Sequence, residues 1–139
     1  MTALLLIALF ATALLFGGMA FFAAVLAPLV FRLLPAEQAG RFLRGIFPRY
    51  YLWVLGTSAA ACVALFPLSK LDSGIMAAIA ALTFWLRQVL MPRINALSDR
   101  AKAGDAEAAR GFAFTHRLSV AANLLQLVAA GAVLAGFLT

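Results

Sequence analysis

Long apolar segments make up most of the sequence, and short connections that carry nearly all of the charge separate them. Four segments stand out, at residues 4–31, 48–68, 73–92 and 112–138. An α-helix rises about 1.5 Å per residue, so roughly 20 apolar residues cross the ~30 Å hydrocarbon layer of a bilayer. We therefore expect an all-α integral membrane four-helix bundle, with residues 1–139 forming a single four-span transmembrane domain.

The first segment is longer than one crossing requires, because no charged residue occurs between Thr2 and Phe31. A helix of this length must tilt, bend or protrude from the bilayer. Proline removes a backbone hydrogen bond, so Pro28 is the predicted bend. The segment lacks a basic start and a clear cleavage pattern, and we interpret it as a retained helix and not as a signal peptide.

The first connection has helical periodicity of its own. Between Pro35 and Phe47, apolar residues alternate with Arg41 and Arg44 in a pattern that fits a short amphipathic helix lying on the membrane surface. An ordinary helical connector is the alternative, and the sequence favours neither.

Charge asymmetry predicts the orientation of the bundle. Residues 32–49 carry four basic residues and residues 87–117 carry six, which together are ten of the 11 in the chain. The connection between the second and third segments has only Lys70, next to Asp72. Since basic loops stay in the cytoplasm, we expect both the N-terminus and the C-terminus on the outer face.

Composition agrees with a membrane location. The chain is 65% hydrophobic and 12% charged, whereas soluble domains carry about 25% charged residues. The net charge of +6 comes from residues beside apolar segments, so anionic lipid headgroups, and not nucleic acid, are the predicted counter-charge. We expect a multi-pass protein of the cell membrane, the inner membrane if the source is bacterial.

Polar residues form a stripe along the fourth segment. His116, Ser119, Asn123 and Gln126 follow one another at intervals of three or four residues and so share one face of a helix. Because lipid cannot satisfy these groups, the stripe should face the other helices. It would then serve either to hold helices together or to line a polar cleft.

Other polar residues are expected at the same cytoplasmic depth. Arg87 and Gln88 lie near the end of the third segment, and Tyr50 and Tyr51 lie near the start of the second. Arg87 alone could reach headgroups, and the tyrosines alone could form an interfacial aromatic belt. Taken together they predict a cytoplasm-facing polar pocket, formed by Tyr50, Tyr51, Arg87, Gln88, His116, Ser119, Asn123 and Gln126.

Several kinds of chemistry find no support in the residues. All five acidic residues lie in connections, which disfavours an ion-coupled transporter of the acidic type. No metal site, catalytic set or phosphate loop is recognisable, and Cys62 is interpreted as a packing residue. A single axial haem ligand, His116, remains an alternative, with Met19 or Met91 as a second ligand.

Short motifs along the chain resemble a known group. Gly18 to Pro28, Phe47-Pro-Arg-Tyr-Tyr51, Leu90 to Asn95, and Phe114 to Ser119 are similar to motifs of the four-helix membrane family called domain of unknown function 4149, which includes transmembrane protein 205. The resemblance implies four membrane spans and an activity that is not settled. It also suggests transport, without assigning any residue to it.

Two functions and one structural role follow as hypotheses. The first is a non-enzymatic module whose polar pocket binds or moves a small molecule, lipid or partner segment, with Arg87 as a fixed positive charge. The second is a haem- or porphyrin-handling protein that uses His116. The third is a structural subunit of a larger membrane complex, and a homo-oligomer is also compatible with the sequence.

Overall fold

The computed structural model describes residues 1–138, which form helices throughout apart from short turns. The first rod consists of α1 (Thr2–Phe21), a π-helical turn (Phe22–Leu26) and α2 (Ala27–Leu33). The second is α3 (Ala36–Leu65), and the third consists of α4 (Lys70–Trp85), a second π-helical turn (Leu86–Leu90) and α5 (Met91–Lys102). The fourth rod is α6 (Ala106–Gly136). The predicted all-α class is confirmed.

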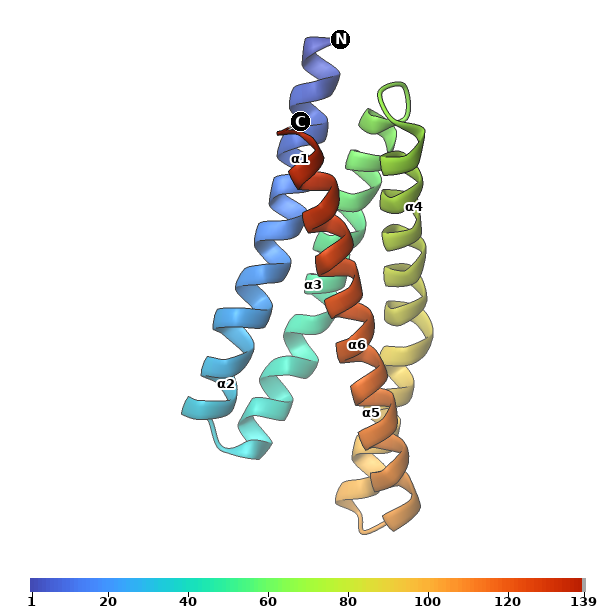
Figure 1. Ribbon diagram of the computed structural model, residues 1–139. Coiled ribbons are helices and arrows are strands. Elements are labelled where there is room, and N and C mark those ends of the chain that lie inside the picture. Colours follow the sequence, from blue (N-terminus) through green and yellow to red (C-terminus); the bar gives the residue numbers. More distant parts are fainter. Residues whose placement is uncertain (139) are drawn as a thin grey trace.

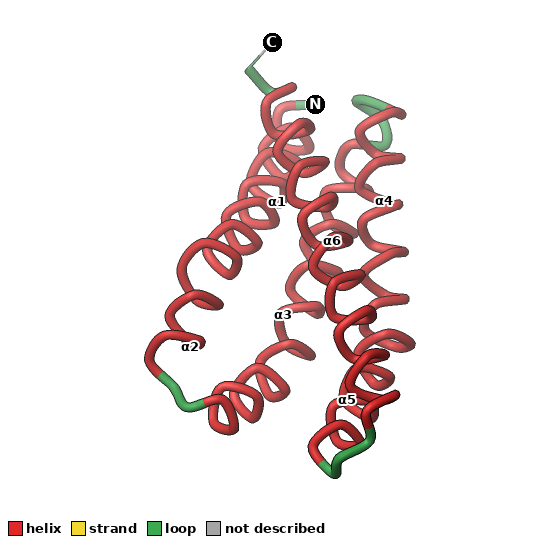
Figure 2. The backbone as a smooth tube through the Cα atoms, turned by 60° about the horizontal axis from the view of Figure 1, so that its bottom comes forward, coloured by secondary structure: helices red, strands yellow, loops and turns green. Residues whose placement is uncertain are grey.

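The rods run side by side, with both chain ends and the α3–α4 connection at one end of the molecule (Figure 1). The α2–α3 and α5–α6 connections lie at the opposite end, which we call the loop end. Helix α3 packs along α1 and α4, and α6 packs against α5 and α1. At the loop end, α2 and the start of α3 lie on one side and α5 with the start of α6 on the other (Figures 1 and 2).

Within residues 1–138, three helices are long and apolar enough to cross a membrane: Thr2–Leu33, Lys70–Lys102 and Ala106–Gly136. Helix α3 is not among these three, since Arg49, Tyr50 and Tyr51 lower the hydropathy of its apolar part. These features fit an integral membrane protein. The fourth predicted span, at residues 48–68, stays a prediction.

The separate amphipathic helix predicted before the second segment is not present as a separate element. Helix α3 begins at Ala36 and continues through Pro48, so residues 36–47 and the first part of the predicted second span belong to one continuous helix. Pro48 has no N–H to donate to the carbonyl of Arg44, which normally weakens a helix. Near this point the guanidinium of Arg49 donates to the carbonyl of Gly45 at 2.8 Å, which helps the turn persist.

Both π-helical turns lie directly before a proline. The N–H of Ala27 bonds to the carbonyl of Phe22, and the N–H of Met91 bonds to the carbonyl of Leu86, each one residue ahead of Pro28 or Pro92. A proline ring collides with the carbonyl four residues earlier, and a wider turn moves that carbonyl away. The helix therefore passes Pro28 with a π-turn on its N-terminal side, and the bend predicted there stays a prediction.

Apolar side chains fill the interior and also cover much of the outside. Leu15, Met76 and Leu86 are fully buried, whereas Val63 and Val128 are 73% and 70% exposed. A soluble protein avoids such large exposed apolar surfaces, but lipid covers them without cost. The distribution agrees with the apolar segments seen in the sequence.

Candidate functional site

The polar residues of α6 meet the tyrosines of α3 in a hydrogen-bonded cluster. The Tyr50 hydroxyl donates to Oδ1 of Asn123 at 3.2 Å, and Nδ2 of Asn123 donates to the Tyr51 hydroxyl at 3.4 Å. The hydroxyls of Tyr51 and Ser119 lie 3.2 Å apart. Asn123 also donates to the backbone carbonyl of Ser119 at 2.8 Å. We call Tyr50, Tyr51, Ser119 and Asn123 the tyrosine–asparagine cluster.

Aromatic rings tie this cluster to the first rod. Phe22, in the first π-helical turn, stacks on Tyr50 with ring centroids 4.3 Å apart. Phe47 lies one helical turn before Tyr51 and its ring is 5.8 Å from the Tyr51 ring. The π-turn before Pro28 thus places Phe22 against Tyr50, one of the two tyrosines that bond to α6.

Gln126 belongs to the same α6 face but makes its contacts with a different helix. Its Nε2 donates to the carbonyl of Ile79 at 3.2 Å and to Oγ1 of Thr83 at 3.0 Å, both on α4. Gln126 is 2% exposed, and its Oε1 has no hydrogen-bond partner among the described residues. Ser119, Asn123 and Gln126 of the predicted stripe therefore face other helices. Ser119 and Asn123 contact α3, whereas Gln126 contacts α4.

A cavity of about 550 Å³ opens at the loop end between α2 and α3 on one side and α5 and α6 on the other. Three predicted residues line it: Tyr51 and Ser119 at its inner wall, and His116 on α6. Most of the wall is apolar. The complete lining is Phe31, Ala36, Gly40, Leu43, Arg44, Phe47, Tyr51, Met91, Ile94, Asn95, Ser98, Ala101, Lys102, Phe112, His116 and Ser119. We call this space the loop-end cavity.

Arg87 and Gln88 lie away from this cavity. Nε of Arg87 is 3.5 Å from the carbonyl of Pro48, to which it donates, and Nη1 donates to Oε1 of Gln88 at 3.5 Å. Arg87 thus lies between the third rod and α3, and Gln88 is exposed. Depth along a helix predicts a shared level for these residues, but it does not fix the side of the helix on which each one lies.

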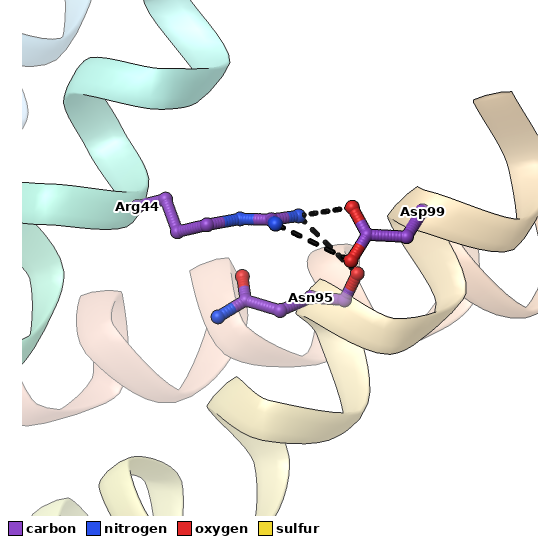
Figure 3. Close-up of polar contacts among 3 residues, drawn as sticks. All are labelled: Arg44, Asn95 and Asp99. Carbon is purple, nitrogen blue, oxygen red and sulfur yellow. Dashed lines mark hydrogen bonds and ion pairs between the residues drawn. The ribbon is translucent and has the colours of Figure 1, made fainter.

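Two basic residues that the sequence did not assign to the pocket, Arg44 and Lys102, line the loop-end cavity. Arg44 on α3 reaches Asp99 on α5, with Nη2 2.8 Å from Oδ1 and Nη1 3.3 Å from Oδ2, and it also donates to the backbone carbonyl of Asn95 (Figure 3). The amine of Lys102 lies near Gly40, where an added Cβ would be 3.9 Å from it. Both cations therefore stand between the two walls of the opening.

A helical repeat could have revealed Arg44. Gly40, Arg44, Phe47 and Tyr51 recur every three or four residues and share one face of α3 only because the helix continues through Pro48. A helix that ended before Pro48 would not show this periodicity. Lys102 offered no comparable signal, since its position depends on how α5 packs.

His116 is exposed and its ring stacks on Phe112, with centroids 5.8 Å apart and an interplanar angle of 14°. Met91 lines the same cavity, whereas Met19 is buried elsewhere and is not part of the lining. Among the described residues, no three His, Cys, Asp or Glu side chains gather into a metal-binding group. Cys62 is half-buried and its sulfur lies 3.5 Å from the Ser73 hydroxyl.

The family described as Domain of unknown function (DUF4149) matches residues 10–103, well over half of the chain. The chain belongs to the DUF4149 family. Neither a curated protein nor a solved structure shows significant similarity to it. The DUF4149 match covers most of the first rod and all of the second and third, so it includes Arg44 and Tyr51, while His116 and Ser119 on α6 lie outside the matched residues.

Proposed function

We propose that this DUF4149 protein is a non-enzymatic, multi-pass protein of the cell membrane whose loop-end cavity binds an amphipathic anion. The observation that carries the proposal is the composition of the cavity wall. Apolar side chains from four helical segments surround the space, and Arg44, Lys102 and His116 stand around it without an acid among the lining residues. The volume of about 550 Å³ falls in the range of small-molecule pockets, about 300–1,000 Å³.

The two kinds of lining favour two parts of one ligand. Phe31, Leu43 and Ile94 offer contacts to a hydrocarbon body, for which burial is favourable. A carboxylate or phosphate would find Lys102 at the opening. Lys102 makes no direct ion pair within residues 1–138, although its charge acts on the nearby Asp99 carboxylate. Arg44 already pairs with Asp99, so Lys102 is the cation with the greater capacity for a new partner.

The membrane arrangement proposed with this site has four spans, with α3 as the span that hydropathy alone does not identify. Support comes from the two chain ends lying at one end of the molecule and the basic connections at the other (Figure 1). By the positive-inside rule the loop end would face the cytoplasm. The cavity would then be accessible from the cytoplasm and from the inner leaflet.

Cysteine labelling tests this orientation. In a Cys62→Ala background, Lys70→Cys marks the α3–α4 connection and Ala103→Cys marks the α5–α6 turn, and both positions are exposed. A membrane-impermeant maleimide should label Lys70→Cys in intact cells and Ala103→Cys only after permeabilisation. Labelling of Ala103→Cys in intact cells would reverse the orientation.

Ligand binding is tested on purified protein in lipid nanodiscs, with a long-chain fatty acid and the alcohol of equal length as probes. Ala101→Phe places a large ring in the cavity wall, and Ala96→Phe places the same ring on an exposed part of α5. The fatty acid should lose binding only in Ala101→Phe. If Ala101→Phe and Ala96→Phe bind the fatty acid equally well, the cavity is not the binding site.

The role of the Lys102 charge is tested by comparing variants of the two lysines. Lys102→Gln should weaken fatty-acid binding about tenfold and leave the alcohol unchanged, since only the acid makes a charge-assisted hydrogen bond. Lys70→Gln alters the other lysine, at the opposite end, where its amine lies 3.2 Å from the Phe66 ring centroid. A loss of the same size in both lysine variants would mean that only the overall charge matters.

The haem alternative keeps His116 and Met91, which line the same cavity. An absorption spectrum of gently purified protein tests it. A Soret band that disappears in His116→Ala would favour haem over the amphipathic anion.

A further inference from the structure

Helix α5 presents a second face, turned away from the loop-end cavity. Arg93, Leu97 and Arg100 line a groove on that face, while Met91, Asn95 and Ser98 line the cavity. The opposite wall of the groove comes from α6, with Arg110, Gly111 and Phe114. The two α5 sets are offset around one helix, so the groove and the cavity lie on different sides of the α5–α6 hairpin.

The floor of the groove is a close helix contact. A Cβ added to Gly111 would lie 3.2 Å from Cδ2 of Leu97, so α5 and α6 approach closely at this pair. Arg93 lies one turn before Leu97, toward the apolar part of its rod, and Arg110 is adjacent to Gly111. Arg93 and Arg110 therefore lie near the same contact point, one on each of the two facing helices, and both line the groove.

Two acids of the hairpin, Asp105 and Glu107, lie at or next to its turn. Asp105 accepts from Nη2 of Arg100 at 2.6 Å, so Arg100 is already neutralised. Glu107 also lines the groove and lies at the start of α6, beside the turn. Within residues 1–138, no ion pair involves Arg93 or Arg110, which are both exposed. Positive charge is thus left at the membrane side of the groove.

An apolar strip continues from this charge toward the predicted bilayer. Arg110, Phe114 and Leu118 follow at intervals of four residues and share one face of α6. Phe114 is 69% exposed and Leu118 is 41% exposed. Since the predicted fourth span begins at Phe112, the arginine lies at headgroup depth and the two apolar side chains at acyl-chain depth.

We infer that this groove, the α5–α6 arginine groove, is a binding site for an anionic phospholipid, with the phosphodiester between Arg93 and Arg110 and an acyl chain along Phe114 and Leu118. Guanidinium groups bind phosphate oxygens through paired hydrogen bonds, and unpaired arginines at the membrane surface attract anionic headgroups. The inference rests on the membrane location but not on the cavity ligand.

The test measures lipid retention by native mass spectrometry of the full chain, with phosphatidylglycerol and phosphatidylcholine of identical acyl chains. Wild type should retain phosphatidylglycerol preferentially. Arg93→Gln with Arg110→Gln should reduce that preference about tenfold. The control double variant, Arg32→Gln with Arg41→Gln, removes the same charge from other helices and should keep the preference. An equal loss in both double variants would overturn the site.

Two further variants separate the lipid from other sources of the signal. Phe114→Ser should weaken retention of the lipid, whereas binding of glycerol phosphate, which has no acyl chain, should not change. If both fall equally, or neither falls, the acyl-chain part is rejected. Ala101→Phe, which fills the loop-end cavity, should leave phosphatidylglycerol retention intact. A loss of phosphatidylglycerol retention in Ala101→Phe would place the lipid in the loop-end cavity instead. An unchanged circular dichroism spectrum in each variant shows that the helices are intact.

Discussion

The hydroxyl of Tyr51 on α3 lies 3.2 Å from the hydroxyl of Ser119 on α6, joining two residues 68 positions apart in the sequence. Both side chains are nearly inaccessible, and both line the inner wall of the loop-end cavity. The contact therefore closes the cavity on its membrane side and fixes α6 against α3. A polar pair in this place gives the bundle interior a specific register that apolar packing alone provides less well.

A double-mutant cycle measures this contact. Tyr51→Phe and Ser119→Ala should each destabilise the protein, and the pair should show a coupling free energy of about 0.6 kcal/mol, the average for hydrogen bonds between membrane helices. Reversible unfolding in detergent or by steric trapping in a bilayer gives the values. Tyr50→Phe with Ser119→Ala serves as the control cycle, since Tyr50 bonds to Asn123 and not to Ser119. A coupling of equal size in the control would contradict the assignment.

Gln126 provides a second test, of a buried contact between α6 and α4. Gln126→Ala should lower the free energy of unfolding by about 2 kcal/mol, because it leaves a space and removes two donated hydrogen bonds. Gln126→Leu should cost less, since it fills the space and removes the unpartnered Oε1. Gln88→Ala, at an exposed position, should change stability by less than about 0.5 kcal/mol. Equal stability of the two Gln126 variants would mean that packing volume is irrelevant there.

Gly18 permits the contact between α1 and α3 near Trp53. A Cβ at Gly18 would lie 2.5 Å from Nε1 of Trp53, the atom that donates to the carbonyl of Leu14 at 3.2 Å. Gly18→Ala should therefore rotate the indole, break this hydrogen bond and cost about 1 kcal/mol. In a Trp85→Phe background, the fluorescence of Trp53 reports the change directly. Gly17→Ala meets nothing within 4 Å and should leave the emission unchanged.

Asp105 at the start of α6 gives a prediction for pH. The N–H of Ala108 and the guanidinium of Arg100 hold the pKa of the Asp105 carboxyl below its ordinary value of 3.8. Because the folded pKa is lower than the unfolded one, the stabilisation is complete above 3.8 and is lost as the pH falls through the folded pKa.

The stability of the wild type is compared with that of Asp105→Asn, whose side chain keeps an oxygen to cap the helix but cannot ionise. Wild type should be the more stable at neutral pH, and the difference should shrink once the pH drops below 3.8, the ordinary pKa of the carboxyl. Thermal unfolding in a non-ionic detergent at a series of pH values provides the measurement. A difference that stays constant down to the lowest pH would contradict it.

The sequence alone determined the helical class, the long apolar rods and the inward direction of the α6 polar face. These properties follow from hydropathy and from the 3.6-residue period, and both are local. Ser119, Asn123 and Gln126 had to find partners on other helices because lipid offers none. The family was also recognisable, since its motifs are short and contiguous.

Only the tertiary structure decided which polar residues share a site. Depth along the rods placed Arg87, Gln88 and His116 at one level, but the direction of each side chain depends on helix rotation, which packing sets. Arg44 joined the cavity because α3 continues through Pro48, an outcome that depends on contacts the local sequence does not contain. The positions of Lys102 and of the α5–α6 arginine groove likewise depend on the packing of α5 against α6. A single helix does not determine which of its faces will be buried, because that depends on the helix that packs against it.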